Sequence, residues 1–428
     1  MSELQLFAPN AMRAVEHRGW GVRPLKFLFR RGKELGEGSE TLLSVYRDHG
    51  VVPKDSRDDN HNRASDDLTK YQLVRRGDLV VNKMKAWQGS VAVSSLDGIV
   101  SPAYFVYSPL AGIENRYAHY LLRTRDYFRF YSAISVGVRP GQWDLDPVAF
   151  DRMPVLLPSL REQRQIADYL DHETTEIDAF IADLNALTAL ANTRLVAQID
   201  RLTAQPSSTD GSTDTVPLSR ALPERVDYRG ATPTKVDYGV QLLTARNVKM
   251  GWIDYETSRE FVAEDDYAAV MSRGLPRRGD ILFTMEAPLG NVALVDRERV
   301  ALAQRLVKFR SAPDVDPQFL CFAMQSAAFQ NQLRSFATGS TVLGIKASKL
   351  SQLRFNVPIM ETQLRIAGLL REAQERSDLL GADIGAAIAL VKERRAALIT
   401  AAVTGQIDVA AKRTPVVDSI QSALEEAR

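Results

Sequence analysis

Apolar residues recur with helical spacing along one long stretch of the chain, from Pro158 to Leu202, which contains no further proline and no glycine. The apolar positions are three, four or seven residues apart, which is the spacing of one face of an α-helix. Ser159 followed by Glu162 predicts a capping box at its start. Such a helix is about 60 Å long, so we expect it to pack against a partner of similar length.

The partner helix is predicted in the same chain, because the pattern Pro-x4-Gln-x2-Ile-Ala-x2-Leu occurs at Pro158 and again at Pro358. Two unrelated amphipathic helices, each covering its own domain, would explain one copy of this pattern but not its repetition. We therefore expect an intramolecular antiparallel coiled coil. Gly405 is the predicted end of the second helix. The residues expected to pair the helices are Gln163, Ile166, Leu170, Ile177 and Leu184 in the first, and Gln363, Ile366, Leu370, Ile384 and Val391 in the second.

Short apolar runs broken by Gly, Asp and Pro precede each predicted helix and indicate strands. In the first half these runs begin at Leu42, Asp78, Ser90 and Tyr104, and helical spacing follows over 116–131. Similar runs return after a Ser/Thr/Asp-rich stretch that predicts a flexible linker. The chain is therefore expected to be a tandem repeat of a globular α+β module and a long helix.

This pattern predicts six segments. They are a globular domain over 1–157, a long helix over 158–204, a linker over 205–216, a second globular domain over 217–357, a second long helix over 358–405 and a tail over 406–428.

Composition limits the possible functions. The chain has 428 residues, a formal net charge of +1, 45% hydrophobic and 25% charged residues, which is ordinary for a globular protein. Any basic surface must therefore be local. Cys321 is the only cysteine, which excludes an intrachain disulfide and a cysteine-rich zinc site. With no predicted signal peptide or membrane span, we expect a cytoplasmic protein.

Common sequence motifs of nucleases, amino-methyltransferases and P-loop ATPases are missing. No lysine follows Asp or Glu by two positions, as a common metal-dependent nuclease site requires, and no Pro-Pro dipeptide of an amino-methyltransferase loop occurs. Gly32-Lys33 is not a Walker A motif, and His61 in a polar loop is most simply solvated. The sequence indicates a protein that binds and does not catalyse.

The candidate binding residues lie in polar loops between the predicted strands. They combine cations that can contact phosphate, aromatic rings, and amides that can hydrogen-bond to base edges. Each loop alone is as well explained by a solvated charged surface, and the tryptophans by half-buried packing. Arg75-Arg76 and Arg277-Arg278 recur before Gly-Asp and are interpreted as scaffold or phosphate contacts. The DNA-binding candidates are Arg30, Arg31, Lys83, Lys85, Trp87, Gln88, Arg139, Gln142 and Trp143 in the first module, and Arg246, Asn247, Lys249, Arg305, Lys346 and Lys349 in the second, where they are expected at places matching those of the first.

With these features together, the chain resembles the specificity subunit of type I restriction-modification enzymes over about residues 20–408. The resemblance rests on the repeated helix start, the ending Ala397–Asp408, the segment Gly98–Tyr104 and the two-module layout. The second helix start departs from the pattern, with Glu361-Thr362-Gln363 where the first has Arg161-Glu162-Gln163. Arg305 also lacks a preceding Ser-Pro.

The resemblance implies a non-catalytic subunit with two α+β target recognition domains related as a pseudo-two-fold repeat. Each domain would read one half of a bipartite, asymmetric site in double-stranded DNA, and the paired helices would fix the half-site spacing. The helices would dock two methyltransferase subunits and, through them, restriction subunits. S-adenosylmethionine, ATP and Mg²⁺ would belong to those partners, with no cofactor or metal in this chain.

Two alternatives stay open at this stage. One is a coiled-coil scaffold without DNA recognition, and the other is a self-contained DNA-modifying enzyme. Partner assembly and DNA affinity that both survive charge reversal at Lys83, Lys85, Arg139 and Lys249 would favour the scaffold. Methyl transfer or cleavage by the chain alone would favour the enzyme.

Overall fold

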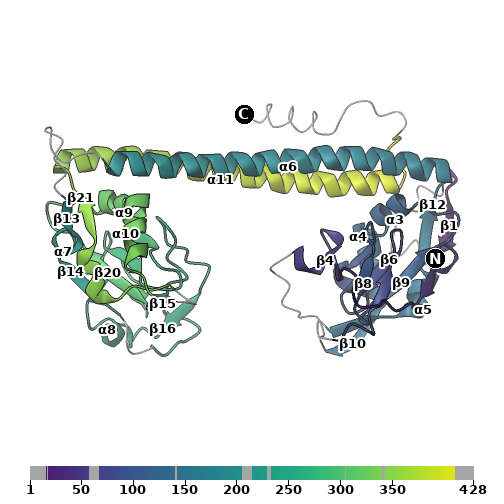
Figure 1. Cartoon of the computed structure of the whole chain (residues 1–428), viewed down its shortest axis with the longest axis horizontal. Coiled ribbons are helices and arrows are strands. Elements are labelled where there is room, and N and C mark those ends of the chain that lie inside the picture. The colour runs from purple at the N-terminus through teal and green to yellow at the C-terminus, as the bar shows by residue number, and fades with distance from the viewer. Residues whose placement is uncertain are drawn as a thin grey trace. The chain divides into compact units, whose positions relative to one another are not determined.

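The computed structural model (Figure 1) describes residues 16, 18–56, 67–139, 142–204, 215–228, 233–303, 305–339 and 343–409. It divides into two compact units, residues 1–184 with 386–428, and residues 185–385. Each unit contains one globular module and parts of both long helices. The predicted α+β class with two modules and two long helices is confirmed. No helix among the described residues is long and apolar enough to cross a membrane.

The two long helices are α6 (Leu160–Thr203) and α11 (Met360–Val403), each of 44 residues. The capping box of α6 forms as predicted: the Ser159 N–H donates to Glu162 Oε2 at 3.0 Å, and the Glu162 N–H donates to Ser159 Oγ at 3.3 Å. After α11, Gly405 adopts a left-handed backbone with φ 67°, which favours glycine and ends the helix.

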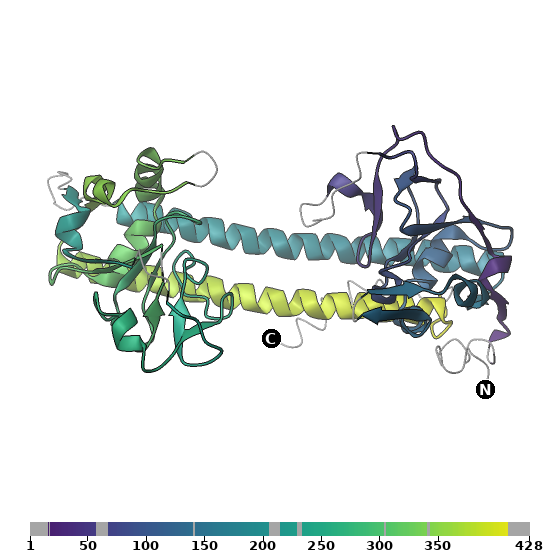
Figure 2. The ribbon, with the colours of Figure 1, turned by 90° about the horizontal axis from the view of Figure 1, so that it is seen from below.

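In the first unit, the start of α6 and the end of α11 lie side by side and antiparallel (Figure 2). Arg395 Nη2 donates to Asp178 Oδ2 at 3.1 Å. The apolar residues of both helices enter the core of the module. From α6 these are Ile166, Leu170 and Ile177, and from α11 they are Val391, Leu398 and Val403.

In the second unit, the end of α6 and the start of α11 pair in the same way. The Ser377 and Asn192 side chains are 3.4 Å apart. Ile366 and Leu370 of α11 share a core with Leu195, Ile199 and Leu202 of α6. Among the other predicted pairing residues, Ile384 of this unit is buried, and Leu184 of the first unit is half-buried.

The first module is built on an antiparallel sheet of order β2-β9-β6-β7. One helix was predicted over 116–131, but the structure has two, because the Thr124 hydroxyl donates back to the Leu121 carbonyl at 2.9 Å where the first ends. The sheet strands are β2 (Phe29–Gly32), β9 (Tyr104–Pro109), β6 (Leu79–Asn82) and β7 (Val91–Val93), and the helices are α3 (Asn115–Leu121) and α4 (Arg125–Ala133).

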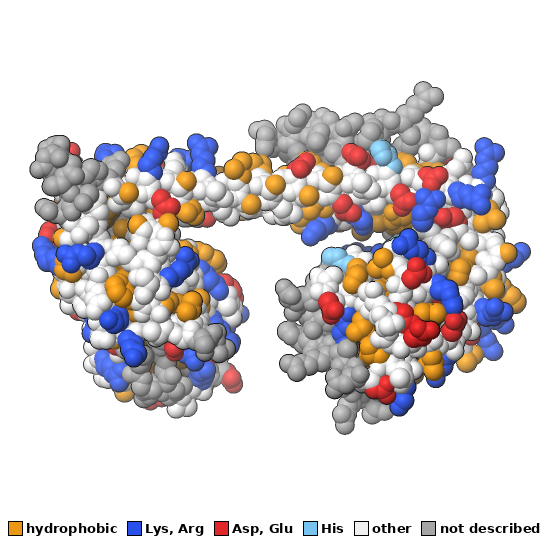
Figure 3. All heavy atoms as spheres, in the orientation of Figure 1, with side chains coloured by type: hydrophobic (Ala, Val, Ile, Leu, Met, Phe, Trp, Pro, Cys, Tyr) orange, Lys and Arg blue, Asp and Glu red, His pale blue; other side chains and the backbone are white. Residues whose placement is uncertain are grey.

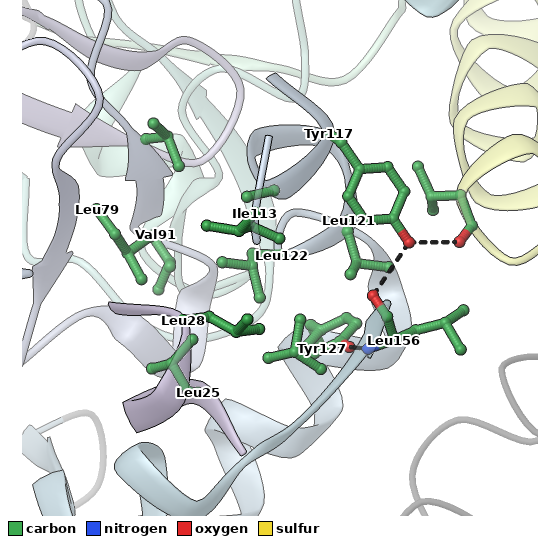
Figure 4. Close-up of a cluster of buried hydrophobic side chains, with 14 of the residues drawn as sticks. Leu25, Leu28, Leu79, Val91, Ile113, Tyr117, Leu121, Leu122, Tyr127 and Leu156 are labelled. Atoms are coloured by element: carbon green, nitrogen blue, oxygen red, sulfur yellow. Dashed lines mark hydrogen bonds between the residues drawn. The ribbon is translucent and has the colours of Figure 1, made fainter. Parts of the chain in front are cut away.

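Tyr117 of α3 joins this module to the long helices (Figure 4). Its ring is fully buried. Its hydroxyl lies 3.2 Å from the Leu156 carbonyl and 3.4 Å from the Val403 carbonyl at the end of α11. A buried hydroxyl needs such partners, so this residue fixes the module against α11 within the first unit.

Smaller strand pairs and short helices complete the first module. The pairs are β1 (Gly21–Pro24) with β12 (Pro154–Leu157), β3 (Leu43–Tyr46) with β4 (Gly50–Pro53), β5 (Gln72–Val74) with β8 (Gly98–Val100), and β10 (Ser135–Arg139) with β11 (Gln142–Leu145). The helices are α5 (Pro147–Arg152) and the 3-10 helices η1 (Leu25–Phe27), η2 (Lys54–Ser56) and η3 (Ala86–Gln88).

The second module repeats the first. Its antiparallel sheet has the order β14-β20-β17-β18, and two helices follow β20 as α3 and α4 follow β9. The sheet strands are β14 (Glu224–Asp227), β20 (Leu306–Arg310), β17 (Ile281–Thr284) and β18 (Val292–Leu294), and the helices are α9 (Pro317–Gln325) and α10 (Ala327–Ser335). The module also contains a strand pair, β13 (Thr215–Pro217) with β21 (Arg354–Asn356). A second sheet has the order β16 (Glu260–Val262), β15 (Val240–Leu243) and β19 (Ala301–Leu302). The short helices are α7 (Leu218–Ala221), α8 (Tyr267–Val270) and the 3-10 helix η4 (Ala347–Gln352).

The repeated Arg-Gly-Asp segments form the same turn in both modules. The Arg75 N–H donates to Asp78 Oδ2 at 2.8 Å, and the Arg277 N–H donates to Asp280 Oδ2 at 2.8 Å. Each turn enters the central strand of its sheet. These segments are therefore parts of the scaffold, one of the two interpretations made from the sequence.

Candidate nucleic-acid interface

The first candidate surface is the loop 83–89, which follows the central strand β6 of the first module. It contains η3 and ends at Gly89, where φ is 90° and an added Cβ would lie 2.8 Å from the Phe128 ring. Only glycine fits this close approach to α4. The Leu145 N–H donates to the Lys83 carbonyl at 2.9 Å, so the β10–β11 hairpin is attached to the same loop.

Two aromatic rings join the loop to the hairpin. The ring centroids of Trp87 and Trp143 are 4.9 Å apart with the planes at 57°. The Trp87 Nε1–H donates to the Met84 carbonyl at 3.1 Å, and both rings are half-buried. They form a rigid base beside which Lys85 and Gln88 are exposed and Lys83 is partly exposed. The structure thus brings together five of the nine candidates of this module.

The remaining candidates of the first module lie elsewhere or cannot be placed. Arg139 and Gln142 pair at the end of the hairpin, but their side chains lie outside the described residues. Arg30 and Arg31 are exposed on β2, which is separated from β6 by β9. The Arg31 guanidinium lies over the Phe105 ring at 3.9 Å. These two arginines are therefore not part of the loop cluster.

The counterpart of this loop in the second module is the segment 285–290, between β17 and β18. The Ile345 N–H donates to the Met285 carbonyl at 3.1 Å, as Leu145 does to Lys83. Segment 285–290 contains no lysine or arginine but carries Glu286. Sequence reasoning missed this residue; the only signal for it was its position in the repeat.

The expectation that the remaining candidates of the second module occupy matching places is therefore only partly right. Arg246 and Lys249 follow β15. In the repeat, β15 corresponds to the region of β3 and β4 in the first module. These two residues therefore do not correspond to the 83–89 loop. Arg246 is exposed and Lys249 partly exposed, beside an exposed Trp252. Lys346 and Lys349 are exposed at η4, close in sequence to Ile345, and therefore belong to the matching region.

Asn247 is a correction to the predicted site. Its side chain is completely buried. Its Oδ1 accepts from the Thr244 N–H and hydroxyl, both at 2.9 Å, and its Nδ2 donates to the carbonyls of Asp254 at 2.8 Å and Ser258 at 3.0 Å. All of its hydrogen-bonding groups are thus used inside the loop, so Asn247 shapes the loop and does not offer an amide to a base edge.

Gln163 and Gln363 are a second correction. They were expected to pair the helices, but each binds the segment just before the first helix of its own module. Gln163 Oε1 accepts from the Glu114 N–H, and Gln363 Oε1 accepts from the Asp316 N–H, each at 2.8 Å. These glutamines therefore attach each module to its long helix.

The long helices themselves present apolar side chains to solvent (Figure 3). In the second unit Leu187, Leu190 and Leu379 are exposed by 45%, 64% and 65%, and in the first unit Leu390 is exposed by 56%. Exposed leucines on the long helices are available for contact with another protein.

Comparisons with known proteins agree with this architecture. Residues 249–384 match the family described as Type I restriction modification DNA specificity domain. The MjaVIII type I restriction enzyme specificity subunit of Methanocaldococcus jannaschii is 24% identical over 330 residues, covering 71% of this chain and 75% of the relative.

Among solved structures, one chain matches with a TM-score of 0.66 at 14% identity, covering 91% of this chain and 98% of its own length. That structure is described as the structural basis of complex assembly and conformational transition of the type I R-M system. The likeness shows a shared fold. The family match over residues 249–384 and the curated relative make the chain similar to the specificity subunits of type I restriction-modification enzymes.

Proposed function

We propose that this chain is the DNA sequence-recognition subunit of a type I restriction-modification complex. Each module reads one half of a bipartite, asymmetric site in double-stranded DNA. The paired helices set the distance between the half-sites and dock the methyltransferase subunits, two in this proposal, and through them the restriction subunits. S-adenosylmethionine, ATP and Mg²⁺ then act in those partners, and this chain supplies recognition and no catalytic residue.

The observation that carries the proposal is one scaffold with two different exposed surfaces. The sheets, turns and glutamine attachments repeat, whereas the loop after the central strand carries Lys83, Lys85 and Trp87 in one module and Glu286 in the other. Hydrogen bonds and charges in such loops are what distinguish base pairs in a groove. Two modules of equal fold and unequal loop chemistry fit a site whose halves differ in sequence.

The helix pair supports the remainder of the proposal. Antiparallel pairing in each unit makes α6 and α11 stiff. A stiff connection between two DNA-binding modules lets two modest affinities combine into a high affinity for DNA, but only when the half-sites have one particular spacing. The exposed leucines on these helices are the apolar surface that partner helices would cover.

The test is selection of a random-sequence DNA library by the chain copurified with its methyltransferase partner, followed by sequencing of the retained DNA. We expect two short motifs at one fixed spacing. Exchange of residues 217–357 for the corresponding module of another specificity subunit should change one motif and leave the other. Intact assembly with no enriched sequence would contradict the proposal and favour the scaffold.

A second expected result concerns the lysines of the first module. Reversing charge in Lys83→Glu with Lys85→Glu should weaken DNA binding and reduce the slope of log affinity against log salt by about two, if each lysine contacts one phosphate. The matched control is Lys26→Glu with Lys70→Glu, two exposed lysines of the same module outside the 83–89 loop. An equal effect of both double variants would show general charge attraction and no specific contact. The measurement is a salt titration of binding.

A further inference from the structure

Glu286 and Arg305 face each other at the ends of the two central strands of the second module. Glu286 lies two residues after β17, and Arg305 directly precedes β20, which pairs with β17 through Thr284 and Leu306. Arg305 Nε lies 3.1 Å from Glu286 Oε1, and the two side chains are exposed by 54% and 45%. This ion pair occupies the place that the Lys83–Gly89 loop has in the first module.

The backbone at this place is held in an unusual conformation. Arg305 has φ 72° and Ala287 has φ 48°, both in the left-handed region, which costs a residue with a side chain about 1 kcal/mol. The Met285 N–H donates to the Arg305 carbonyl at 3.1 Å and stabilises the arrangement. A glycine would adopt this turn without steric cost. The presence of arginine therefore indicates that its side chain has a use there.

The backbone of Glu286 is fixed on its other side by Gly344. Glu286 forms an antiparallel bridge with Gly344, where an added Cβ would lie 3.3 Å from the Glu286 Cβ. Glu286 is thus held between Gly344 and Arg305. The contact uses Nε of the guanidinium, and within the described part of the chain no hydrogen bond involves its two terminal nitrogens.

The negative charge of Glu286 beside Arg305 helps to distinguish between a contact of Arg305 with a DNA phosphate and a contact with a base. A carboxylate next to a phosphate is repelled, so a site built to bind the DNA backbone would not place Glu286 beside its arginine. A guanidinium that contacts such a carboxylate through Nε still has two terminal nitrogens to donate, and these match the O6 and N7 acceptors of guanine, the commonest specific contact of arginine in the major groove.

We infer that Arg305 reads a guanine in the half-site of the second module and that Glu286 is a positioning residue that holds the guanidinium in the reading orientation. The inference rests on the proposed function, because it names one base contact of that recognition. It predicts that one position of one half-site depends on both residues. It also predicts that no position of the other half-site does.

The experiment compares the wild-type chain, Arg305→Gln and Glu286→Gln, each copurified with its methyltransferase partner, by selection of the same random library. In the wild type we expect a guanine at one position of the second-module motif, which the module exchange identifies. Arg305→Gln should reduce the preference for that guanine by about 5- to 150-fold. Glu286→Gln should reduce it at the same position and at no other.

Arg299→Gln is the matched control, because Arg299 forms an ion pair with Glu264 elsewhere in the same unit at similar exposures of 61% and 57%. It should leave both motifs unchanged. If Arg305→Gln weakened DNA binding equally for every sequence, and lowered the slope of log affinity against log salt by about one, Arg305 would contact a phosphate and the inference would be overturned. Motifs identical to wild type in Arg305→Gln would also overturn it. Absence of any motif with the wild-type chain would instead contradict the proposed function.

Discussion

Asp280→Ala is expected to lower the free energy of unfolding of the second module by about 3–5 kcal/mol, because it removes one partner of a buried ion cluster. Asp280 is almost completely buried. It accepts from Arg310 Nε at 2.8 Å and Nη2 at 2.9 Å, and it lies 3.4 Å from the Nζ of Lys308, whose side chain is fully buried. Without this carboxylate, Glu224 at 3.0 Å is the one ionic partner that Lys308 keeps among the residues that the structure describes. A fully buried ammonium that loses one of its two carboxylate partners is only partly compensated, so the loss should be large.

The first module provides the control for this prediction. Asp78 accepts the same turn hydrogen bond from an arginine N–H. The buried lysine has no counterpart there: Lys308 lies opposite Leu282 in the second module, and the equivalent pair in the first module is Val106 opposite Val80. Burial there raises the pKa of Asp78. Asp78→Ala should therefore cost only about 1–3 kcal/mol, the penalty for an unsatisfied turn amide.

Hydrogen exchange of amides in β17 and β6 measures the two effects separately. Lys308→Met added to Asp280→Ala should recover part of the loss, because it removes the buried charge that has lost a partner and keeps an apolar chain in its place. Equal losses from Asp280→Ala and Asp78→Ala would show that the turn alone matters. They would contradict the role given to the buried cluster.

Much of the fold follows from local sequence patterns. The long helices are defined by an apolar period that extends over their full length, and a period of that length has no other common explanation. Gly405 and the Ser159–Glu162 box determine helix ends through backbone conformation and local hydrogen bonds, which depend on few residues. The strands β6 and β7 and the repeat itself are visible for the same reason.

The parts that could not be predicted depend on contacts between segments distant in sequence. Asn247 and Lys249 are both polar residues of one loop, and only the folded loop shows that the first is buried and the second partly exposed. Glu286 has no local signal, since its ionic partner Arg305 lies just before β20, which neighbours β17 in the sheet but is distant in sequence. The roles of individual loop residues in binding DNA stay predictions, because side-chain reach is decided by loop conformation.

Gln163→Ala is expected to destabilise the attachment of the first module to α6 by about 2–4 kcal/mol, since it leaves several buried backbone groups without partners. Its Oε1 accepts from the Glu114 N–H, and its Nε2 donates to the carbonyls of Gly112 at 3.2 Å and Pro158 at 2.9 Å. The amide is the one group of this size that can accept and donate in this way. Gln163→Glu should be at least as damaging, because a carboxylate cannot donate to two carbonyls.

The same geometry in the second module tests whether this contact explains the repeated Pro-x4-Gln motif. The Gln363 amide nitrogen donates to the carbonyls of Asp314 at 3.1 Å and Pro358 at 2.7 Å, so Gln363→Ala should cost a similar amount in that module. Gln165→Ala, an exposed glutamine on the same helix as Gln163, should change stability by less than about 0.5 kcal/mol. Exchange rates of the Glu114 and Asp316 amides report each contact directly. Unchanged protection of these amides in the alanine variants would mean that the module is held by its apolar core alone. Loss of protection confined to the mutated module would show that the motif recurs because each module needs its own attachment.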